Sequence, residues 1–534
     1  MHRVVALVCL LACAAAASAS ARASSDFTGH HRQVIPVVVV RGLSLADIPW
    51  LAQEGAVGLL VPNAGPRTSA GDAFAGMVRG VLYNARLPRP HDLVLIHVTK
   101  ATAIPRHGPL IVVGLPPERT TKNGTRYPIA VLGRGWHGTL SSSLTRVPGL
   151  VSMADVARTA LLTPHALHAT PSRDAAASVL RLESRIEVAR SSALAATLLV
   201  LGLLVAFALF YPSGAPAALG AALVANLALG WAAAGSTAPR LVLLGLCTVA
   251  GGILGARFLR SRAALGFALV GVLAAYTVAM AVHPWALSLA PLGPELTSRF
   301  YGVSNLLETL LLVPALLSAK LLSERSAKLL GERFFGPFAF GAVALLALTA
   351  IAENRLGDDG GGAIVVAAAF AVLALAMTGA RRRVIVPALG LAVVAVTALL
   401  GIDAASTTSD HLRGVLDGGI GGLAHVAHNR VPLSYARMLE QWYLVFPAAI
   451  ALAVGIAVIR AARSRRKAAV PLALIAGLAV SVLVNDSPAS VSLAGLTALL
   501  AVEGGLLHRR LVLPVAARLG IYGRTTVGRP RTQE

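Results

Sequence analysis

Residues 191–211 read SSALAATLLVLGLLVAFALFY, and none of these side chains is charged. A helix of about 20 apolar residues crosses the roughly 30 Å hydrocarbon layer of a bilayer. Similar stretches recur along the rest of the chain. We predict about eleven spans: 191–211, 215–234, 240–256, 263–282, 303–319, 336–352, 363–379, 384–402, 442–459, 468–484 and 489–506. The sequence therefore predicts a polytopic, all-α membrane bundle, with the lipid bilayer as its first partner.

Lysine and arginine are distributed unevenly between the loops that join these spans. The loops and tail on one side hold 21 of them, whereas the loops between spans on the other side hold six. In membrane proteins the cytoplasmic loops carry the basic excess. We therefore expect a cell-membrane protein with residues 24–190 outside and the C-terminus in the cytoplasm. The same distribution accounts for much of the net charge of +23, so we do not expect nucleic acid as a partner.

The N-terminus has the organisation of an export signal. A basic start, an apolar run and the small residues Ala21-Arg22-Ala23 predict a signal peptide over 1–23, with an uncleaved anchor as the alternative. The other expected units are an extracytoplasmic domain (24–165), a linker helix (166–190), a transmembrane domain (191–506) and a basic cytoplasmic tail (507–534). Only three cysteines occur in the chain, and their positions favour neither a disulfide framework nor a thiolate metal site.

The expected extracytoplasmic domain alternates between strand and helix patterns. VIPVVVV (34–40) is a continuous apolar run, which is typical of a strand buried on both faces. LADIPWLAQEGAVGLLVP (45–62) reads as a helix followed by a strand, and 92–98, 108–116 and 126–135 are further strand candidates. This alternation predicts a doubly wound α/β sheet with a site at the carboxyl ends of its strands.

One segment of this domain resembles a known superfamily. Residues 127–162, YPIAVLGRGWHGTLSSSLTRVPGLVSMADVARTALL, are similar to the closing segment of alkaline-phosphatase-like domains. The superfamily pattern G-L-V-x-x-x-D-x-A-P-T falls on residues 149–151, Asp155 and Thr159, with Arg158 where proline is usual. The resemblance also implies that the nucleophile position falls on Thr68 or Ser69.

The first strand departs from the metal-dependent members of that superfamily. They place an aspartate directly after this strand, whereas Arg41-Gly42 stands here, and the paired Asp and His ligands are not evident. Two-metal phosphoryl chemistry needs several carboxylate and imidazole ligands around a shared centre. The resemblance therefore implies a reduced, metal-free alkaline-phosphatase-like sheet that serves for binding.

Three predicted loops on the domain side of the membrane carry unusual polar groups. They contain RFYGVSN (299–305), ENRLGDDGGGA (353–363) and TTSDHLRGVLDGG (407–419). Ionisable groups near the membrane are functional candidates because their burial is costly. The candidate catalytic residues are Asp358, Asp359 and His411, and the candidate substrate-binding residues are Arg299, Tyr301, Asn305, Glu308 and Arg413. We expect these residues to line one cavity at the outer leaflet; separate solvated loop residues are the alternative.

The order of domains and motifs also resembles known membrane proteins. An alkaline-phosphatase-like domain, many spans and the motifs at 299–305, 357–361 and 409–413 are similar to a family of uncharacterised bacterial polytopic membrane proteins. The domain order resembles that of ethanolamine-phosphate transferases of glycolipid anchors, and the arginine-glycine-asparagine loop resembles those of O-antigen ligases and polymerases. These resemblances are analogies at the level of the fold and assign no activity.

Three functional interpretations remain open. The first is a cell-envelope transferase or ligase that acts on a phosphorylated, lipid-linked substrate. Arg299 and Arg413 would hold phosphate, Asp358 or Asp359 would act as a base or bind a cation, and His411 would shuttle a proton. The second is a transporter or flippase, and the third is a non-catalytic scaffold for envelope assembly. Neither catalysis nor a cofactor follows from the sequence.

Overall fold

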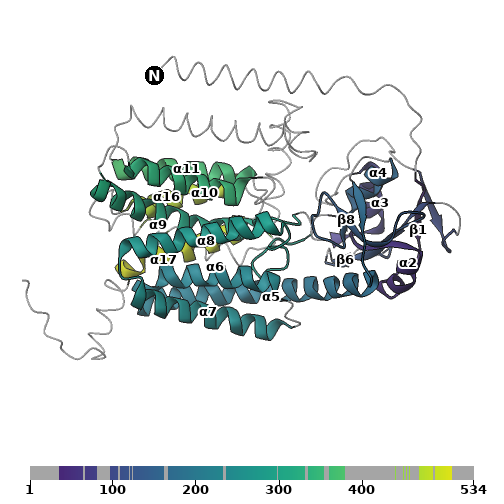
Figure 1. Ribbon diagram of the computed structural model, residues 1–534, viewed down its shortest axis with the longest axis horizontal. Coiled ribbons are helices and arrows are strands. Elements are labelled where there is room, and N and C mark those ends of the chain that lie inside the picture. The colour runs from purple at the N-terminus through teal and green to yellow at the C-terminus, as the bar shows by residue number, and fades with distance from the viewer. Residues whose placement is uncertain are drawn as a thin grey trace, which may run out of the picture.

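The protein has two parts, an α/β sheet domain and a bundle of apolar helices (Figure 1). The computed structural model describes residues 35–63, 67–80, 97–105, 109–118, 121–122, 124–161, 166–232, 236–296, 299–330, 335–353, 360–378, 468–484 and 488–507, with isolated positions between 439 and 456. The predicted signal segment and the tail beyond residue 507 lie outside these ranges. The predicted order, an α/β domain followed by apolar helices, is confirmed.

In the described part of the sheet domain, eight strands form one sheet; seven of them lie side by side in the order β10-β8-β2-β7-β5-β1-β4, while β9 also pairs with β2. Their bounds are β1 Val37–Val40, β2 Gly55–Val61, β4 Val98–Ala101, β5 Leu110–Gly114, β7 Tyr127–Leu132, β8 Gly138–Ser142, β9 Leu150–Ser152 and β10 Leu167–Thr170. A separate two-stranded sheet pairs β3 (Arg67–Thr68) with β6 (Thr121–Lys122). The helix and strand predicted within 45–62 are present as α2 (Ile48–Glu54), preceded by the short η1 (Leu45–Asp47), and β2.

Strand β7 departs from the predicted doubly wound arrangement. Strand β1 pairs in parallel with β4 and β5, and β2 pairs in parallel with β8 and β9. Strand β7, however, runs antiparallel to both of its neighbours, β2 and β5. A parallel return needs a long crossover, usually a helix, and the described residues between β5 and β7 hold only the short β6. The sheet is therefore mixed.

The strands are buried on both faces because alternate side chains enter two different cores. Val38 and Val40 of β1 pack in one core, and Val37 and Val39 pack in the other. Helices α2 and α5 (Ala175–Phe210) contribute to the first core. Helices α3 (Ala70–Arg79) and α4 (Met153–Ala160) contribute to the second (Figure 1). The continuous apolar run 34–40 therefore correctly predicts a strand that is buried on both faces.

Within the described residues, the bundle contains six helices that are long and apolar enough to cross a membrane: 175–210, 212–231, 237–258, 262–282, 305–327 and 361–378. Shorter apolar helices at 336–352, 469–481 and 490–503 coincide with three further predicted spans. The predicted spans 384–402 and 442–459 lie outside the described residues, apart from isolated positions. The helix bounds are α6 Ala215–Trp231 (after η2, Pro212–Gly214), α7 Thr237–Phe258, α8 Arg262–Val282, α9 Asn305–Leu330, α10 Phe335–Ala352, α11 Gly360–Thr378, α16 Ala469–Val484 and α17 Pro488–Leu507.

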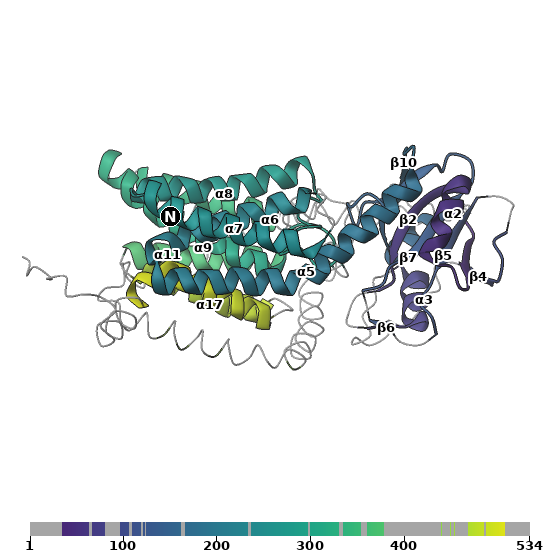
Figure 2. The same cartoon turned by 90° about the horizontal axis from the view of Figure 1, so that it is seen from below.

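Helix α5 belongs to both parts of the protein. It begins after Asp174, whose side chain accepts a hydrogen bond from the Ala177 amide, and continues without a break for 36 residues. Its first half packs on the sheet through Val179 and Ile186, and its second half packs in the bundle through Val200 and Leu204. Figure 2 shows the helix leaving the sheet domain and running along the bundle. The predicted linker 166–190 therefore contains β10 and the start of this helix.

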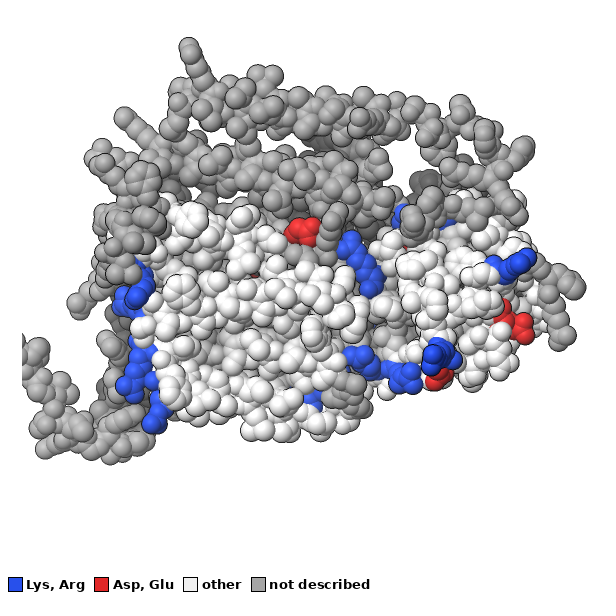
Figure 3. All heavy atoms as spheres, in the orientation of Figure 1, with Lys and Arg blue, Asp and Glu red and all other residues white. Residues whose placement is uncertain are grey.

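Basic side chains gather at the end of the bundle that lies away from the sheet domain (Figure 3). Arg257, Arg260 and Arg262 lie where α7 ends and α8 begins, and Lys320 and Arg325 lie in the C-terminal part of α9. This arrangement places one set of the predicted basic loops at one end of the molecule.

Candidate functional site at the junction of the domain and the bundle

A long loop joins the sheet domain to the bundle. This bridging loop comprises residues 283–304 between α8 and α9, of which 283–296 and 299–304 are described. Leu296 and Phe300 pack in the core of the sheet domain, whereas Leu287 and Leu292 pack in the core of the bundle. Because the same loop enters both cores, the two parts are held together by this loop as well as by α5 itself.

Hydrogen bonds fix the bridging loop to the bundle and also hold the loop to itself. The Leu292 amide donates to Oδ1 of Asn226 at 2.8 Å. Nδ2 of the Asn226 side chain donates to the hydroxyl of Tyr276 at 3.3 Å. Ser288 Oγ donates to the Phe300 carbonyl at 2.7 Å, and Ser304 Oγ donates to the Leu292 carbonyl at 3.0 Å. A buried polar group without a partner is costly, so these paired groups favour one loop conformation.

A charged cluster lies beside this junction, between α5 and the segment that precedes β7. Arg126, whose side chain is 2% exposed, donates from Nε to Glu183 Oε2 at 2.5 Å and from Nη2 to Glu183 Oε1 at 2.8 Å. Its Nη2 also lies 3.3 Å from Glu187 Oε2. Two parallel bonds to one carboxylate form the strongest common ion-pair geometry. Arg126 thus fixes the first glutamate and leaves the side chain of the second, 69% exposed, facing solvent.

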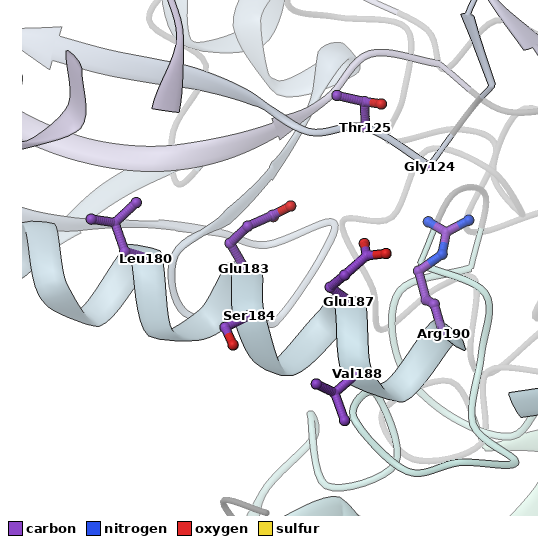
Figure 4. Close-up of a pocket in the computed structure, with 8 residues that line it drawn as sticks. All are labelled: Gly124, Thr125, Leu180, Glu183, Ser184, Glu187, Val188 and Arg190. Carbon is purple, nitrogen blue, oxygen red and sulfur yellow. The ribbon is translucent and has the colours of Figure 1, made fainter. Parts of the chain in front are cut away.

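A cavity of about 660 Å³ opens next to this cluster (Figure 4). Figure 4 shows Glu183, Glu187 and Arg190 extending from α5 toward the segment that holds Gly124 and Thr125. Arg190 lies in the electrostatic field of both glutamates, of Glu295 and of Arg126. The cavity is open to solvent, and its volume falls within the range of small-molecule pockets, about 300–1,000 Å³. The residues that line the cavity are Gly124, Thr125, Leu180, Glu183, Ser184, Glu187, Val188 and Arg190.

The predicted substrate-binding residues that are described lie at the start of α9 and in the bridging loop. Arg299 is half-buried, and its Nη1 donates to the Val303 carbonyl. Tyr301 is 6% exposed and packs in the core of the sheet domain, where Arg146 covers its ring at 4.2 Å from the centroid. Asn305 begins α9, and Glu308 is fully buried one turn later.

These four residues are close in the chain, but Tyr301 serves to dock the loop on the sheet. The other predicted site residues, Asp358, Asp359, His411 and Arg413, lie outside the described residues. The cavity that we expect them to share with Arg299 stays a prediction.

The positions that resemble the alkaline-phosphatase-like pattern take part in local structure. Thr68 is buried and donates to Asn63 Oδ1 at 3.0 Å. Ser69 caps α3, since its Oγ accepts from the Asp72 amide at 3.1 Å. Asp155 is the N3 residue of the capping box at the start of α4, where it accepts from the Ser152 amide, and it also accepts from Ser142 Oγ at 2.6 Å. Among the described residues, no group of three or more His, Cys, Asp or Glu side chains could hold a metal ion.

The carboxyl of Asp155 has an unusually high pKa for a residue of a capping box. The residue is fully buried, and desolvation raises the pKa of its carboxyl to about 7, against the hydrogen bonds from Ser142 and Ser152, which lower it. Burial disfavours the charged form of any carboxyl. Strongly shifted groups often mark functional sites, but this one lies beneath α4 and belongs to a capping box. We therefore assign it to stability.

Reasoning from sequence missed the charged cluster at the junction. Part of a signal was present, because Glu183, Glu187 and Arg190 are spaced at i, i+4 and i+7 and share one face of a helix. Arg126, however, is 57 residues away from Glu183 in the chain. Only the packing of α5 on the sheet brings the two together.

Comparison of the chain with protein-family models, with curated proteins and with solved structures gives no match.

Proposed function

We propose that the chain is a multi-pass cell-envelope protein whose junction cavity binds the head group of a phosphorylated, lipid-linked substrate, as part of a transferase or ligase reaction. The observation that carries this proposal is the cavity of about 660 Å³ lined by two carboxylates and a guanidinium. The cavity lies on α5 directly before the apolar stretch that follows Arg190. The head group of a membrane lipid can therefore enter the cavity while the lipid's acyl chains stay in the bilayer.

The chemistry of the cavity suits a head group that carries both polar hydrogen-bond donors and phosphate. A guanidinium binds phosphate oxygens with two parallel hydrogen bonds, and Arg190 presents its guanidinium at one end of the cavity. Carboxylates accept hydrogen bonds from amines or from sugar hydroxyls, and Glu187 presents a largely exposed carboxylate. An apolar wall is supplied by Leu180 and Val188. This combination favours an amphiphile over a simple anion.

The distribution of charge supports one orientation in the membrane. The basic residues at the end of the bundle away from the sheet domain match the cytoplasmic excess of lysine and arginine. We therefore infer that the sheet domain and the cavity are extracytoplasmic and that the C-terminus is cytoplasmic.

The predicted catalytic loops are compatible with this site. The loop that carries Asp358 and Asp359 joins the end of α10 to the start of α11. On the inferred orientation the end of α10 and the start of α11 face the same side as the sheet domain. The proposed base, Asp358 or Asp359, and the proposed proton shuttle His411 would then act on a head group held at the junction.

A separate proposal concerns the role of the sheet domain. We infer that it is a reduced alkaline-phosphatase-like sheet that serves for binding. The α/β layers are compatible with that origin, and the hydrogen bonds of Thr68 and Ser69 support a structural role for the two nucleophile positions. The antiparallel strand β7 is the feature of the sheet that agrees least with it.

A non-catalytic envelope scaffold is the second candidate, and a different observation favours it. The sheet domain is fixed to the bundle by the continuous helix α5 and by the bridging loop, which enters both cores. A rigid connection of this kind suits a protein that presents a domain at a fixed height above the membrane. A scaffold does not need an occupied junction cavity, so occupancy separates the two candidates.

A pair of glycine variants tests occupancy of the cavity. A Cβ added at Gly124 would lie 3.6 Å from Arg190 Nη2, an ordinary van der Waals distance, so Gly124→Leu places an apolar side chain beside this guanidinium of the cavity. A Cβ at Gly71, on the exposed surface of α3, would meet only Ser69 Oγ at 3.9 Å, and Gly71→Leu is the matched control. Native mass spectrometry of the full-length protein in detergent reports the lipids that stay bound. We expect Gly124→Leu to lose the most tightly held phosphorylated lipid and Gly71→Leu to keep it; equal retention by both would refute the proposal.

A further inference from the structure

Two arginines lie close together beneath the bridging loop, on a different face of α5 from the junction cavity. Arg240 is fully buried in the first turns of α7, and its Nη1 donates to the Leu289 carbonyl at 3.3 Å. Arg185 is half-buried, and its Nη2 donates to the Gly230 carbonyl, at the end of α6, at 3.3 Å. At about 100° per residue along a helix, Arg185 projects away from the side that carries the cavity glutamates.

The two carbonyl acceptors belong to segments that touch. A Cβ added at Gly230 would lie 2.3 Å from the Ala286 carbonyl and 3.2 Å from the Ala290 Cβ, so the end of α6 lies directly against the bridging loop. The charge of Arg185 acts on Arg240. The structure thus holds two like charges near each other in a buried place, an arrangement that is costly unless a counter-charge neutralises it.

Three nitrogen atoms of this arginine pair remain buried without a hydrogen-bond partner among the described residues: Nε and Nη2 of Arg240, and Nε of Arg185. No ion pair joins either arginine to a carboxylate in the described part of the chain. Buried polar groups in native proteins are nearly always paired. The unused donors therefore indicate a ligand.

The unused donors of Arg240 have a specific geometry. Nε and Nη2 lie on the same edge of a guanidinium and donate in parallel. Arg126 uses this same edge in this protein, because its Nε and Nη2 hold the two oxygens of Glu183. At Arg240 the edge is buried and has no hydrogen-bond partner among the described residues, and its geometry matches a group with two or more oxygens on one centre.

We propose that Arg185 and Arg240 form a binding site for one phosphate group beneath the bridging loop. Two positive charges match the charge of a phosphate, and its oxygens satisfy the Nε and Nη2 donors of Arg240 and the Nε donor of Arg185. The phosphate comes either from free phosphate in solution or from the head group of an anionic lipid. The site is separate from the junction cavity and does not depend on the function proposed for that cavity.

Thermal melting of the full-length protein in detergent tests this site. The probes are inorganic phosphate and phosphatidylglycerol, and the references are sodium chloride at equal ionic strength and diacylglycerol. We expect phosphate, phosphatidylglycerol or both to raise the melting temperature of the wild-type protein, and the references to have no comparable effect. A response to phosphatidylglycerol alone identifies a lipid as the source, and a response to free phosphate identifies a solution anion.

Variants decide whether the response comes from the arginine pair. We expect Arg185→Gln to weaken apparent affinity at least about tenfold, the loss expected when a charge-assisted hydrogen bond is removed. Arg240→Lys keeps the buried charge but removes the parallel donors, and we expect a similar loss. Arg181→Gln, at an exposed position of α5 near Arg185, is the matched control and should bind as the wild type does.

Two results would overturn the proposal. One is a wild-type protein that responds to neither probe, or variants of Arg185 and Arg240 that respond as the wild type does. The other is a gain of phosphate binding in Asp358→Asn or Asp359→Asn, which would show that a carboxylate of the chain already occupies the pair. The variant Gly124→Leu should keep the phosphate response, so a failure of this site and a failure of the junction cavity can be told apart.

Discussion

Removal of the Tyr301 ring should release the bridging loop from the sheet domain. The ring is 6% exposed, packs in the core of the sheet domain and is covered by the guanidinium of Arg146 at 4.2 Å. Truncation of a buried aromatic residue to alanine costs about 3–5 kcal/mol, and this range includes a cation–π contact of about 0.5–2 kcal/mol. We therefore expect Tyr301→Ala to destabilise the docked loop by about 3–5 kcal/mol. Tyr301→Phe keeps the ring and should cost less than about 1.5 kcal/mol.

Hydrogen–deuterium exchange of the full-length protein in detergent measures this effect locally. The Leu292 amide is bonded to Asn226 and the Leu296 amide to the Arg299 carbonyl, so both exchange only when the loop opens. At about 1.4 kcal/mol per factor of ten, Tyr301→Ala should speed their exchange by about two to four orders of magnitude. Exchange within about fivefold of the wild-type rate would show that the ring does not hold the loop, and the rigid connection of the two parts would then be wrong.

Three further predictions concern the cap of α4, the contact between α6 and the bridging loop, and the exposure of that loop. Burial raises the pKa of Asp155 from 3.8 to about 7, so the folded state binds more protons than the unfolded state between these values. The free energy of unfolding should therefore fall as pH rises from about 4 to 7, by up to about 1.4 kcal/mol for each pH unit. Asp155→Asn should remove this dependence, and a slope unchanged in urea titrations would contradict it. Gly230→Ala places a Cβ 2.3 Å from a carbonyl of the bridging loop and should cost about 1–3 kcal/mol, whereas Gly202→Ala, which meets nothing within 4 Å, should not destabilise; equal melting temperatures would count against the contact. Glu295→Cys, at an exposed position, should react with a membrane-impermeant maleimide added to the extracytoplasmic side, and its labelling from the cytoplasmic side alone would reverse the inferred orientation. Ser288→Cys, in the same loop and 1% exposed, should react only after unfolding.

Features that depend on local pattern could be predicted from the sequence. The apolar run 34–40 predicts strand β1 because a strand buried on both faces needs apolar residues at every position. The uncharged stretch 191–211 likewise predicts the second half of α5. The whole of α5 could not be predicted as one helix, because its polar first half follows a different pattern and is stabilised by the sheet.

Features that depend on contacts between distant segments could not be predicted. On the predicted topology, Arg299 and Arg240 both lie on the side of the membrane where lysine and arginine are scarce, so their positions are unusual in the sequence. Only the folded structure shows that Arg240 is fully buried. Tyr301 reads as a polar side chain at a membrane surface, but its environment is set by a sheet that begins more than 260 residues earlier in the chain. The antiparallel direction of β7 depends on its connection to β5, in which the described residues form no helix.

Photo-crosslinking from the cavity tests the central proposal most directly. A photoreactive residue at Leu180, which is 37% exposed and lines the junction cavity, samples what the cavity holds. The same residue at Leu198, which is 53% exposed on the apolar half of the same helix, samples the bulk lipid. The proposal predicts that lipids crosslinked from position 180 in native membranes are enriched in phosphorylated, lipid-linked species relative to those from position 198. Identical lipid profiles from the two positions would contradict it.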